Sequence, residues 1–503
     1  MSACDAIVVG GGISGLAAAH RLGELAAARG TPIRVTLLEA GTRLGGSVAT
    51  ERVDGFLVEK GADSFLTEKP WALALCRRLG LDDRLIGTRD TQRRTYVVHD
   101  GRLHPLPEGF LLVAPTRLGP LLRSPLFTWA GKLRMACDLV LPRGAGRADG
   151  SDESIAAFVS RRVGREAFER VVQPLVGGIY TGDADRLSIA ATMPRLVEME
   201  RRSRSLILGM LRQARAAGAQ SGARWGLFAS FADGMQTLVD ELARRLPEGA
   251  VRLGAAVASL RPPSASGASA ERPGTPAPDW EVGLASGERL SAPRVIVATP
   301  AFAAADLLRP FDAGLADDLA GIPYASSAIV TLAFPRADVP HPLDGFGFVV
   351  PAIERRRSIA GSFSSVKYAG RAPEGAVLIR LFCGGALAPD VSACSDDALI
   401  ALARDELRAL LGIVAAPRLI RVQRHVRAMP QYHLGHRARL VRIDAAVARH
   451  PGLALAGNAY RGVGSPDSVH SGESAAERVA GVPAGGCEAP AGVGAAVPSP
   501  AGP

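Results

Sequence analysis

The pattern of apolar residues at the start of the chain predicts a strand, a tight turn and a helix in succession. Residues 6–9 form an apolar run that is too short for a helix and ends at a glycine, as in a buried parallel strand. A GxGxxG turn with Gly10, Gly12 and Gly15 follows, and the helical sequence LAAA begins at residue 16. In such a turn the first glycine permits the sharp bend, the second lets a pyrophosphate approach the backbone, and the third lets helix and strand pack closely. The free N–H groups of the helix N-terminus then face the diphosphate.

The segment that follows strengthens the prediction of a dinucleotide site. Residues 34–38 (RVTLL) predict a second strand, and Glu39 follows at the spacing where a carboxylate accepts hydrogen bonds from ribose hydroxyls. An ExxxRxGG pattern starts at this glutamate, contains Arg43 and ends at Gly46. Because glycine-rich turns are common, GxGxxG alone is a weak signal, and the strand, the acid and the second glycine loop give it weight. The alternative for Glu39 is an exposed acid at a strand end.

Further along, strand and helix patterns alternate, which predicts an α/β protein. Patterns typical of strands lie at residues 93–98, 251–260, 280–284, 294–299, 330–334, 345–351, 378–382 and 453–458. Helical patterns lie at residues 70–79, 154–163 and 468–479. Residues 261–279 are a Pro/Ser/Ala-rich insertion that we expect to be a disordered hairpin tip, and we expect the Gly/Ala/Pro-rich tail at 483–503 to be unstructured.

Composition and charge narrow the class of protein only in part. The 503 residues are 47% hydrophobic and 21% charged, which is typical of a globular protein of two or three domains. The net charge of +10 brings nucleic acid or an anionic membrane surface into consideration. Nearly all of that charge is arginine, a bias that a GC-rich genome also produces without functional meaning. Since the chain has no aromatic-rich basic motif, we expect no nucleic-acid partner.

The cysteines and the apolar runs indicate where the protein acts. The 6 cysteines are scattered, with no CxxC spacing and no histidine at metal-ligand spacing, so we expect no metal site and a reducing, cytoplasmic setting. The chain enters its first strand within a few residues, which predicts that no signal peptide is present. No apolar run reaches the roughly 18 residues of a membrane-spanning helix. We therefore expect any membrane association to be peripheral, at the inner face of the cell membrane.

Both glycine loops and a C-terminal segment resemble a known cofactor domain. GxGxxG, ExxxRxGG and residues 457–467 (GNAYRGVGSPD) are similar to the FAD domain of the flavin amine oxidase and protoporphyrinogen oxidase superfamily. The resemblance implies FAD, held non-covalently because no cysteine lies in the C-terminal motif, whose helix would face flavin N1 and O2. It implies these cofactor-binding residues: Gly10, Gly12, Ile13, Ser14, Gly15, Glu39, Ala40, Arg43, Gly45, Gly46, Ser47, Gly61, Ala62, Asp63, Ser64, Val257, Gly457, Gly464 and Ser465.

Two further strings resemble the oxygen-dependent protoporphyrinogen/coproporphyrinogen oxidase family specifically. They are LHPLP at residues 103–107 and PLVGGIYTGD at residues 174–183. The resemblance implies a porphyrinogen site in which an arginine pairs with a propionate, a glycine lies against the ring, and apolar side chains line the pocket. The implied substrate-binding residues are Arg94, with Arg93 as its alternative, Gly178, Phe346, Val349 and Phe382. Each also fits a plain structural role, as a solvated arginine, a packing glycine or a core residue.

The resemblance also implies a domain organisation. Residues 110–140 mix leucines and aromatics with arginine and lysine, and three prolines prevent one long helix. In the family this region is a helical, membrane-facing domain, and the alternative is an ordinary helical lid. The implied fold class is α/β, with a Rossmann-type FAD-binding domain, an α+β substrate domain and this helical domain. The expected boundaries are 1–67, 224–300 and 448–482 for the FAD domain, 176–223 and 301–447 for the substrate domain, and 68–175 for the helical domain.

The activity implied by the resemblance is the FAD-dependent oxidation of protoporphyrinogen IX to protoporphyrin IX in haem biosynthesis. Six electrons would pass through the flavin to dioxygen with release of hydrogen peroxide, and the product would be handed to the next haem-pathway enzyme. We predict no catalytic residue and no metal, because the flavin accepts the hydride and positioning matters more than an acid or base; His433 and His436 are predicted to be structural. The alternatives are a coproporphyrinogen III oxidase, a flavin amine oxidase in which Lys367 holds a water near the flavin, and a prenyl-GTPase escort-type protein that reuses the fold without turnover.

Overall fold

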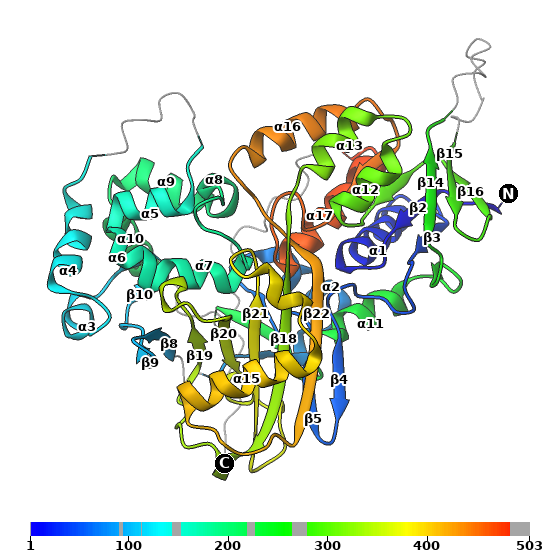
Figure 1. Cartoon of the computed structure of the whole chain (residues 1–503). Helices are drawn as coiled ribbons and strands as arrows, with labels where there is room; N and C mark the ends of the chain where they lie inside the picture. The colour runs from blue at the N-terminus through cyan, green and yellow to red at the C-terminus, as the bar shows by residue number, and fades with distance from the viewer. Residues whose placement is uncertain are drawn as a thin grey trace.

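The computed structural model describes residues 2–89, 94–111, 113–142, 152–218, 227–263 and 279–482. A five-stranded parallel sheet carries the N-terminal motif, and distant parts of the chain build it (Figure 1). Its strand order is β13 (Val251–Arg252), β3 (Val35–Leu38), β2 (Ala6–Val9), β17 (Val295–Val297) and β23 (Leu453–Leu455). Because the strands are parallel, the loops after their carboxyl ends meet at one edge of the sheet, where ligands bind in open α/β sheets.

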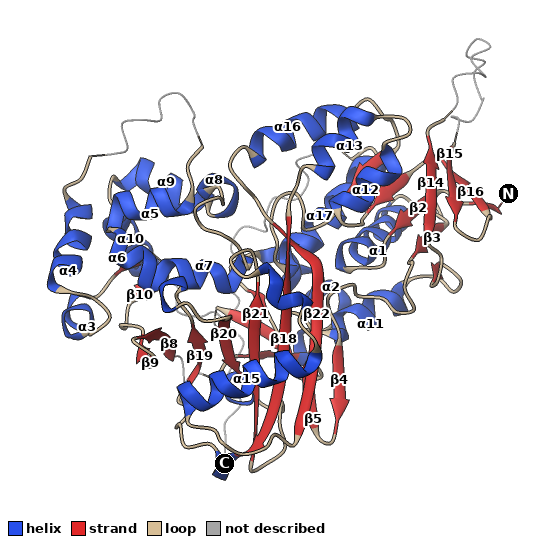
Figure 2. Ribbon diagram, in the orientation of Figure 1, coloured by secondary structure: helices blue, strands red, loops and turns tan. Residues whose placement is uncertain are grey.

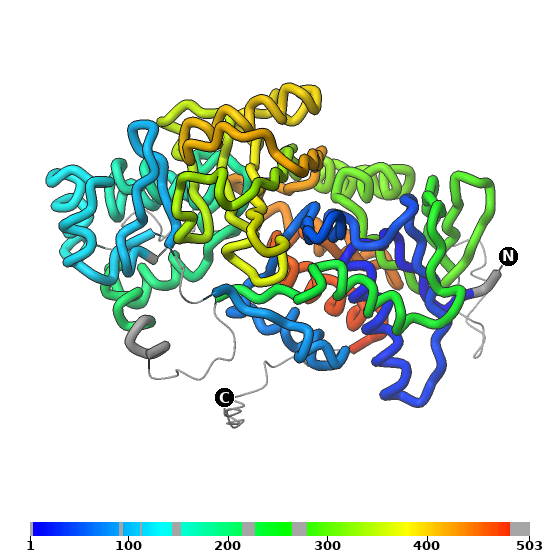
Figure 3. Tube along the Cα trace, turned by 90° about the horizontal axis from the view of Figure 1, so that it is seen from below, coloured from blue at the N-terminus to red at the C-terminus, as the bar shows by residue number. Residues whose placement is uncertain are grey.

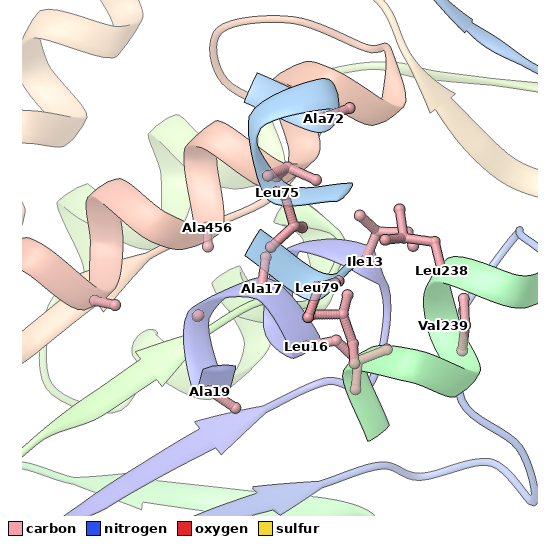
Figure 4. Packing of buried hydrophobic residues seen from close by; sticks show 14 of the residues in the cluster. Ile13, Leu16, Ala17, Ala19, Ala72, Leu75, Leu79, Leu238, Val239 and Ala456 are labelled. Carbon is pink, nitrogen blue, oxygen red and sulfur yellow. The ribbon is translucent and has the colours of Figure 1, made fainter. Parts of the chain in front are cut away.

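Helices cover both faces of this sheet. One face packs against α1 (Ile13–Ala28), α2 (Pro70–Leu79), α11 (Gln236–Arg245) and α17 (Ser465–Val479), as Figure 4 shows in part. The first and last of these helices approach closely, since a Cβ on Gly472 would lie 2.1 Å from the carbonyl oxygen of Ser14. The other face packs against α12 (Ala301–Leu308), α13 (Ala313–Ala320) and α16 (His436–Val447). The same core includes a small sheet of β1 (Ser2–Ala3), β16 (Arg289–Ala292), β15 (Trp280–Leu284) and β14 (Val257–Arg261).

A second, seven-stranded sheet lies beside the first (Figure 2). Its order is β22 (Leu419–Pro430), β18 (Tyr324–Pro335), β21 (Ala376–Gly384), β20 (Ser358–Phe363), β19 (Gly345–Val349), β8 (Arg94–His99) and β9 (Arg102–Pro105). One face is covered by α15 (Asp396–Leu411), which packs on alternate residues such as Val330, Leu381 and Phe348. The opposite face therefore presents the residues between these, among them Phe382 and Arg380.

Helices from residues 118 to 218 form a separate layer at the opposite end of the molecule from the N-terminus (Figure 3). They are α3 (Leu118–Arg123), α4 (Trp129–Ala136), α5 (Ile155–Val163), α6 (Arg165–Ala167), α7 (Gln173–Tyr180), α8 (Ile189–Thr192), α9 (Pro194–Ser203) and α10 (Leu206–Gly218). Their core contains a fully buried ion pair between Asp138 and Arg162, whose side chains are 0% and 1% exposed. No helix within the described ranges is both long and apolar enough to cross a membrane.

The structure confirms the predicted strands at 6–9 and 280–284 and the predicted helix at 70–79 residue for residue. Three other segments complete the comparison. PLVGGIY, for which no secondary structure was predicted from the sequence, forms the helix α7, with Pro174 in its first turn. The helix α2 of the expected helical region packs in the core of the parallel sheet, and β8 and β9 extend the seven-stranded sheet. Residues 264–278, within the expected hairpin tip, and the tail at 483–503 lie outside the described residues, although β14 and β15 do pair as a hairpin around the former.

Candidate active site

The first glycine turn has the shape that a diphosphate site needs. Gly10 has φ +108°, and a Cβ on Gly15 would lie 1.9 Å from the carbonyl oxygen of Gly10, so both positions require glycine for the chain itself. A Cβ on Gly12, in contrast, would meet no protein atom within 4 Å. The 16-residue helix α1 that starts here has no side-chain cap, so the first N–H groups, from Ile13 onward, are available to a ligand.

The carboxylate of Glu39 is held in position by two backbone groups. Its Oε2 accepts the N–H of Gly11 and its Oε1 accepts the N–H of Gly41, both at 2.7 Å. Each oxygen keeps a further lone pair that can accept from a ribose hydroxyl. Val257 begins β14 beside this point, since residues Gly254 and Ala255 donate to the carbonyls of Gly41 and Glu39 at 2.9 Å. The predicted ribose and adenine contacts are thus brought together.

The second glycine loop lies alongside the first turn. Gly45 donates its N–H to the carbonyl of Gly11 at 2.8 Å and forms a bridge with Gly12. The guanidinium of Arg43 donates to the carbonyls of Val48 and Leu44 at 2.9 and 3.0 Å, so it braces the loop that runs from Ala40 to Ser47. The loop lies beside the open space next to Gly12. A group bound by the first turn would extend along this loop.

The segment from Gly61 to Ser64 carries a buried charge cluster. A Cβ on Gly61 would lie 2.0 Å from the carbonyl oxygen of Ser47, so this segment packs on the glycine loop. Asp63 accepts from Lys367 Nζ at 3.1 Å and lies 3.6 Å from Arg380, and Ser64 donates to it at 2.8 Å. Burial alone would raise the pKa of the Asp63 carboxyl, but the two cations lower this pKa well below its usual range. The Asp63 carboxyl is therefore ionised, and it faces two basic side chains.

The C-terminal motif is the last of the segments that are predicted to bind the cofactor. Gly457, with φ +140°, follows β23 and donates its N–H to Ser471 Oγ at 2.9 Å. α17 starts at Ser465, after Gly464, whose N–H donates to Asp467 at 3.1 Å. Lys69 Nζ lies 2.6 Å from the same carboxylate. The motif therefore anchors the C-terminal helix against the start of α2.

The face of the seven-stranded sheet opposite α15 brings several predicted substrate residues into one row. Strand register pairs Val349 with Ala360, Ala360 with Phe382, and Phe382 with Ile329. Gly178 of α7 lies over the end of this row, because its Cβ would be 4.0 Å from Val349 Cγ1. Arg380 lies two residues before Phe382 in the same strand and therefore on the same face of the sheet. Its guanidinium donates to the carbonyl of Gly61 at 2.5 Å. The row therefore lies next to the segment expected to pass the flavin ring.

Two predicted residues lie apart from this row. Arg94, at the start of β8, pairs with Asp344 at 2.5 Å, and its side chain is 63% exposed. Phe346 is partly buried in β19, next to that end of β8. The alternative arginine, Arg93, lies outside the described residues.

The two histidines singled out in the sequence, and two cavities of the described part of the chain, lie away from this row. His436 stacks on Tyr432 at 4.2 Å, and its Nε2 lies 2.9 Å from the carbonyl of Tyr460, in keeping with a structural role. A cavity of about 440 Å³ is lined by Arg186, His433 and Arg439 among others. A smaller one of about 90 Å³ lies between α16 and α17. Neither contains a predicted substrate-binding residue, so strand register, rather than cavity shape, defines the candidate substrate site.

Sequence reasoning missed the partners of Asp63. Lys367 was considered only as a water-holding residue, yet its ammonium is bound to the Asp63 carboxylate. Arg380 was not considered at all, although one signal for it exists. It interrupts the apolar strand VLIRLF, and a charged residue inside a buried strand requires a buried partner.

A parallel sheet with a glycine turn, a fixed acid after its second strand, a second glycine loop and a C-terminal helix start define an FAD-binding oxidoreductase fold. The family model described as "Flavin containing amine oxidoreductase" matches residues 13–480, and the chain belongs to this family. Within it, the chain belongs to the oxygen-dependent protoporphyrinogen/coproporphyrinogen oxidases, as the sequence motifs predicted. It is an oxidoreductase, and its cofactor is FAD, which confirms both predictions.

Several relatives support this assignment. Coproporphyrinogen III oxidase of Bacillus subtilis is 35% identical over 93% of this chain and 96% of its own length. The enzyme of the same name from Propionibacterium freudenreichii is also 35% identical, over 95% and 91%. Chloroplastic protoporphyrinogen oxidase of tobacco is 28% identical over 95% and 85%. A crystal structure of a candidate protoporphyrinogen oxidase from Exiguobacterium sp. 255-15 superposes with a TM-score of 0.81 at 30% identity, covering 95% of this chain and 98% of that one.

Proposed function

We propose that this protein oxidises a porphyrinogen to the corresponding porphyrin, with removal of six electrons and release of hydrogen peroxide from dioxygen. Coproporphyrinogen III is the first candidate substrate, because relatives that are 35% identical over nearly the whole chain bear the name coproporphyrinogen III oxidase. Protoporphyrinogen IX, the substrate favoured by the sequence motifs, is the second. The bound FAD supplies a hydride acceptor and passes the electrons to dioxygen.

The observation that carries this proposal is the row Val349, Ala360, Phe382 and Ile329. It crosses four adjacent strands, which at about 4.8 Å per strand interval span roughly 14 Å. Apolar side chains over this breadth suit a flat, mostly apolar macrocycle. Gly178, without a side chain, would leave room for the ring edge, and the Gly61–Ser64 segment lies above the neighbouring Arg380.

The chain's own contribution to the reaction is then binding and orientation. The oxidation moves a hydride from a bridging carbon of the ring and a proton from a pyrrole nitrogen. The carboxylate beside Arg380, Asp63, is ionised and paired with two cations, which makes it a poor proton acceptor. His425 contacts the carbonyl of Lys60 at 2.8 Å, and burial lowers its pKa, which makes it a weaker proton acceptor than a histidine in water. Positioning the ring against the cofactor is therefore the dominant task of the site.

We test this by anaerobic reduction of the flavin in the purified holoenzyme. Coproporphyrinogen III and protoporphyrinogen IX should each bleach the flavin absorbance, with the former faster, while primary amines should not. Lys367 is held by Asp63, which disfavours the amine oxidase reading. Bleaching by amines and by neither porphyrinogen would refute the proposal.

A peripheral membrane contact of the helical layer is also part of the proposal. Leu118, Trp129, Leu133 and Val140 are 66%, 67%, 68% and 72% exposed, and the basic side chain of Arg117, next to Leu118, is 68% exposed. Exposed apolar side chains next to basic ones suit an anionic lipid surface. Replacing Leu133 by Glu should abolish co-sedimentation with anionic liposomes, whereas Leu387→Glu, at an exposed apolar site outside this helical layer, should not. Wild-type protein that fails to co-sediment would contradict the contact.

The domain boundaries and the hand-off to a following haem-pathway enzyme stay predictions.

A further inference from the structure

An arginine in β22 has a backbone conformation that needs an explanation. Arg427 has φ +46°, in the left-handed region that side-chain-bearing residues rarely occupy. Pairing with β18 is irregular here, since Ser327 pairs with His425 but Ala325 pairs with Met429. The Arg427 N–H donates to Ser326 Oγ at 2.9 Å, which holds the bulge in place. Such bulges redirect a side chain and are frequent next to active sites.

The redirected guanidinium lies on an aromatic platform. Arg427 Cζ is 3.8 Å from the centre of the Phe302 ring. That ring meets the ring of Tyr324 edge to face at 5.1 Å, and the Tyr324 hydroxyl accepts the N–H of Ala301 at 2.8 Å. Stacking through one face leaves the N–H edge of a guanidinium free for two-pronged binding of a carboxylate.

No protein carboxylate fills that role among the residues that the structure describes. Arg421 and Arg424 of the same strand pair with Glu51 and Asp396, but Arg427 has no acidic partner within ion-pairing distance and is exposed. A strained, stacked and unpaired arginine contributes little to the fold. Residues held in such conformations cluster at ligand sites.

The position of Arg427 connects it with the candidate site. Ser326, whose hydroxyl holds Arg427, accepts the N–H of Gly385 at its carbonyl at 2.9 Å. Ala386 in turn donates to the carbonyl of Thr181, directly after α7, at 2.8 Å. Arg427 therefore lies at the end of the sheet where the strand of Phe382 meets the helix of Gly178.

We propose that Arg427 binds one of the two propionate carboxylates that coproporphyrinogen III has and protoporphyrinogen IX lacks, and that it thereby favours the ring with four carboxylates over the ring with two. The assignment rests on the proposed function and deepens it, because it names the propionate as the substrate group that Arg427 recognises. Because Arg427 lies outside the apolar row, it would hold a propionate of the ring in solvent while the macrocycle stays on the row.

The test measures binding of coproporphyrin III, its tetramethyl ester and protoporphyrin IX to the FAD-loaded enzyme by fluorescence quenching. Arg427→Gly should raise the Kd for coproporphyrin III about tenfold or more. It should leave the ester unchanged and reduce the preference for coproporphyrin III over protoporphyrin IX. Its Tm should equal or exceed that of the wild type, because glycine adopts a positive φ freely. Arg427→Lys should restore part of the affinity, and Arg424→Met, whose wild-type partner is Asp396, is the matched control.

Two results would overturn the assignment: an unchanged Kd for coproporphyrin III in Arg427→Gly, or an equal loss for the uncharged ester. Failure of the proposed function looks different. In that case no porphyrinogen bleaches the wild-type flavin. If the wild type is bleached and Arg427→Gly binds coproporphyrin III normally, the function stands and only the role of Arg427 fails.

Discussion

Replacing Gly12 by alanine separates a loss of cofactor binding from a loss of fold. A Cβ at this position meets no protein atom within 4 Å, and φ −72° with ψ 177° is an allowed conformation for alanine. The free energy of unfolding of the apoprotein should therefore change by no more than about 0.5 kcal/mol. The methyl group would occupy the space that the diphosphate is expected to enter. We expect the Kd for FAD to rise at least about tenfold, which is about 1.4 kcal/mol of binding free energy.

Gly15→Ala provides the matched control in the same turn. Its Cβ would lie 1.9 Å from the carbonyl oxygen of Gly10, so the strand or the helix must shift. Overpacking of this kind costs about 1–3 kcal/mol, and the apoprotein itself should lose that stability. Urea unfolding of both apoproteins gives the stabilities, and quenching of FAD fluorescence on titration gives the affinities.

The reasoning is refuted if Gly12→Ala binds FAD with the wild-type Kd. It is also refuted if the apoprotein of this variant loses as much stability as that of Gly15→Ala. In the first case the diphosphate does not approach Gly12. In the second case, other atoms of the protein occupy the space next to Gly12 in solution, and the methyl group clashes with them.

Further predictions concern the two buried charge clusters. Arg162→Met should lower the free energy of unfolding in urea by about 3–5 kcal/mol, because it leaves the Asp138 carboxylate buried without its cation; an unchanged urea midpoint would contradict this. Lys367→Met should lower the flavin reduction potential in a dye-coupled titration, because it removes a cation next to the segment that is expected to pass the flavin ring, and a raised potential would count against the placement of Asp63 near the ring. The pKa of Asp63 is lower in the folded than in the unfolded chain, so the unfolded chain binds more protons below about pH 4 and stability falls there as pH drops. Asp63→Asn should weaken this acid-side loss, as measured by urea unfolding between pH 5 and 3.

The cofactor framework could be predicted from the sequence because its signals are local. A glycine at the bend, a glycine at the helix start and an acid at the end of the second strand are each fixed by the backbone within a few residues. The structure accordingly places Gly12, Glu39 and Gly45 around one space. The helix at 70–79 was equally local, with proline at its start and Gly80 in the left-handed conformation at its end.

Contacts between distant strands could not be predicted in this way. Asp63 and Lys367 are 304 residues apart, and no periodicity in the sequence relates them. β22 was not predicted as a strand, because polar residues such as Arg421, Gln423 and His425 occupy its positions facing the cofactor segment. Arg421 and His425 contact Glu51 and the carbonyl of Lys60 in another part of the chain, so the apolar pattern that marks a half-buried strand is missing.

Polar contacts attach the seven-stranded sheet, and the loop that leads into its strand β21, to neighbouring parts of the chain. Arg371 donates to Ser230 Oγ at 2.9 Å and to the carbonyls of Phe231 and Ala232 at 2.9 and 3.1 Å. Arg380 and His425 likewise contact the carbonyls of Gly61 and Lys60. Hydrogen bonds to carbonyl oxygens are directional, whereas apolar contacts allow sliding. The seven-stranded sheet is thus held at a defined position relative to the segment from Lys60 to Ser64. In the proposed function, this attachment would fix the distance between the porphyrinogen and the cofactor, on which hydride transfer depends steeply.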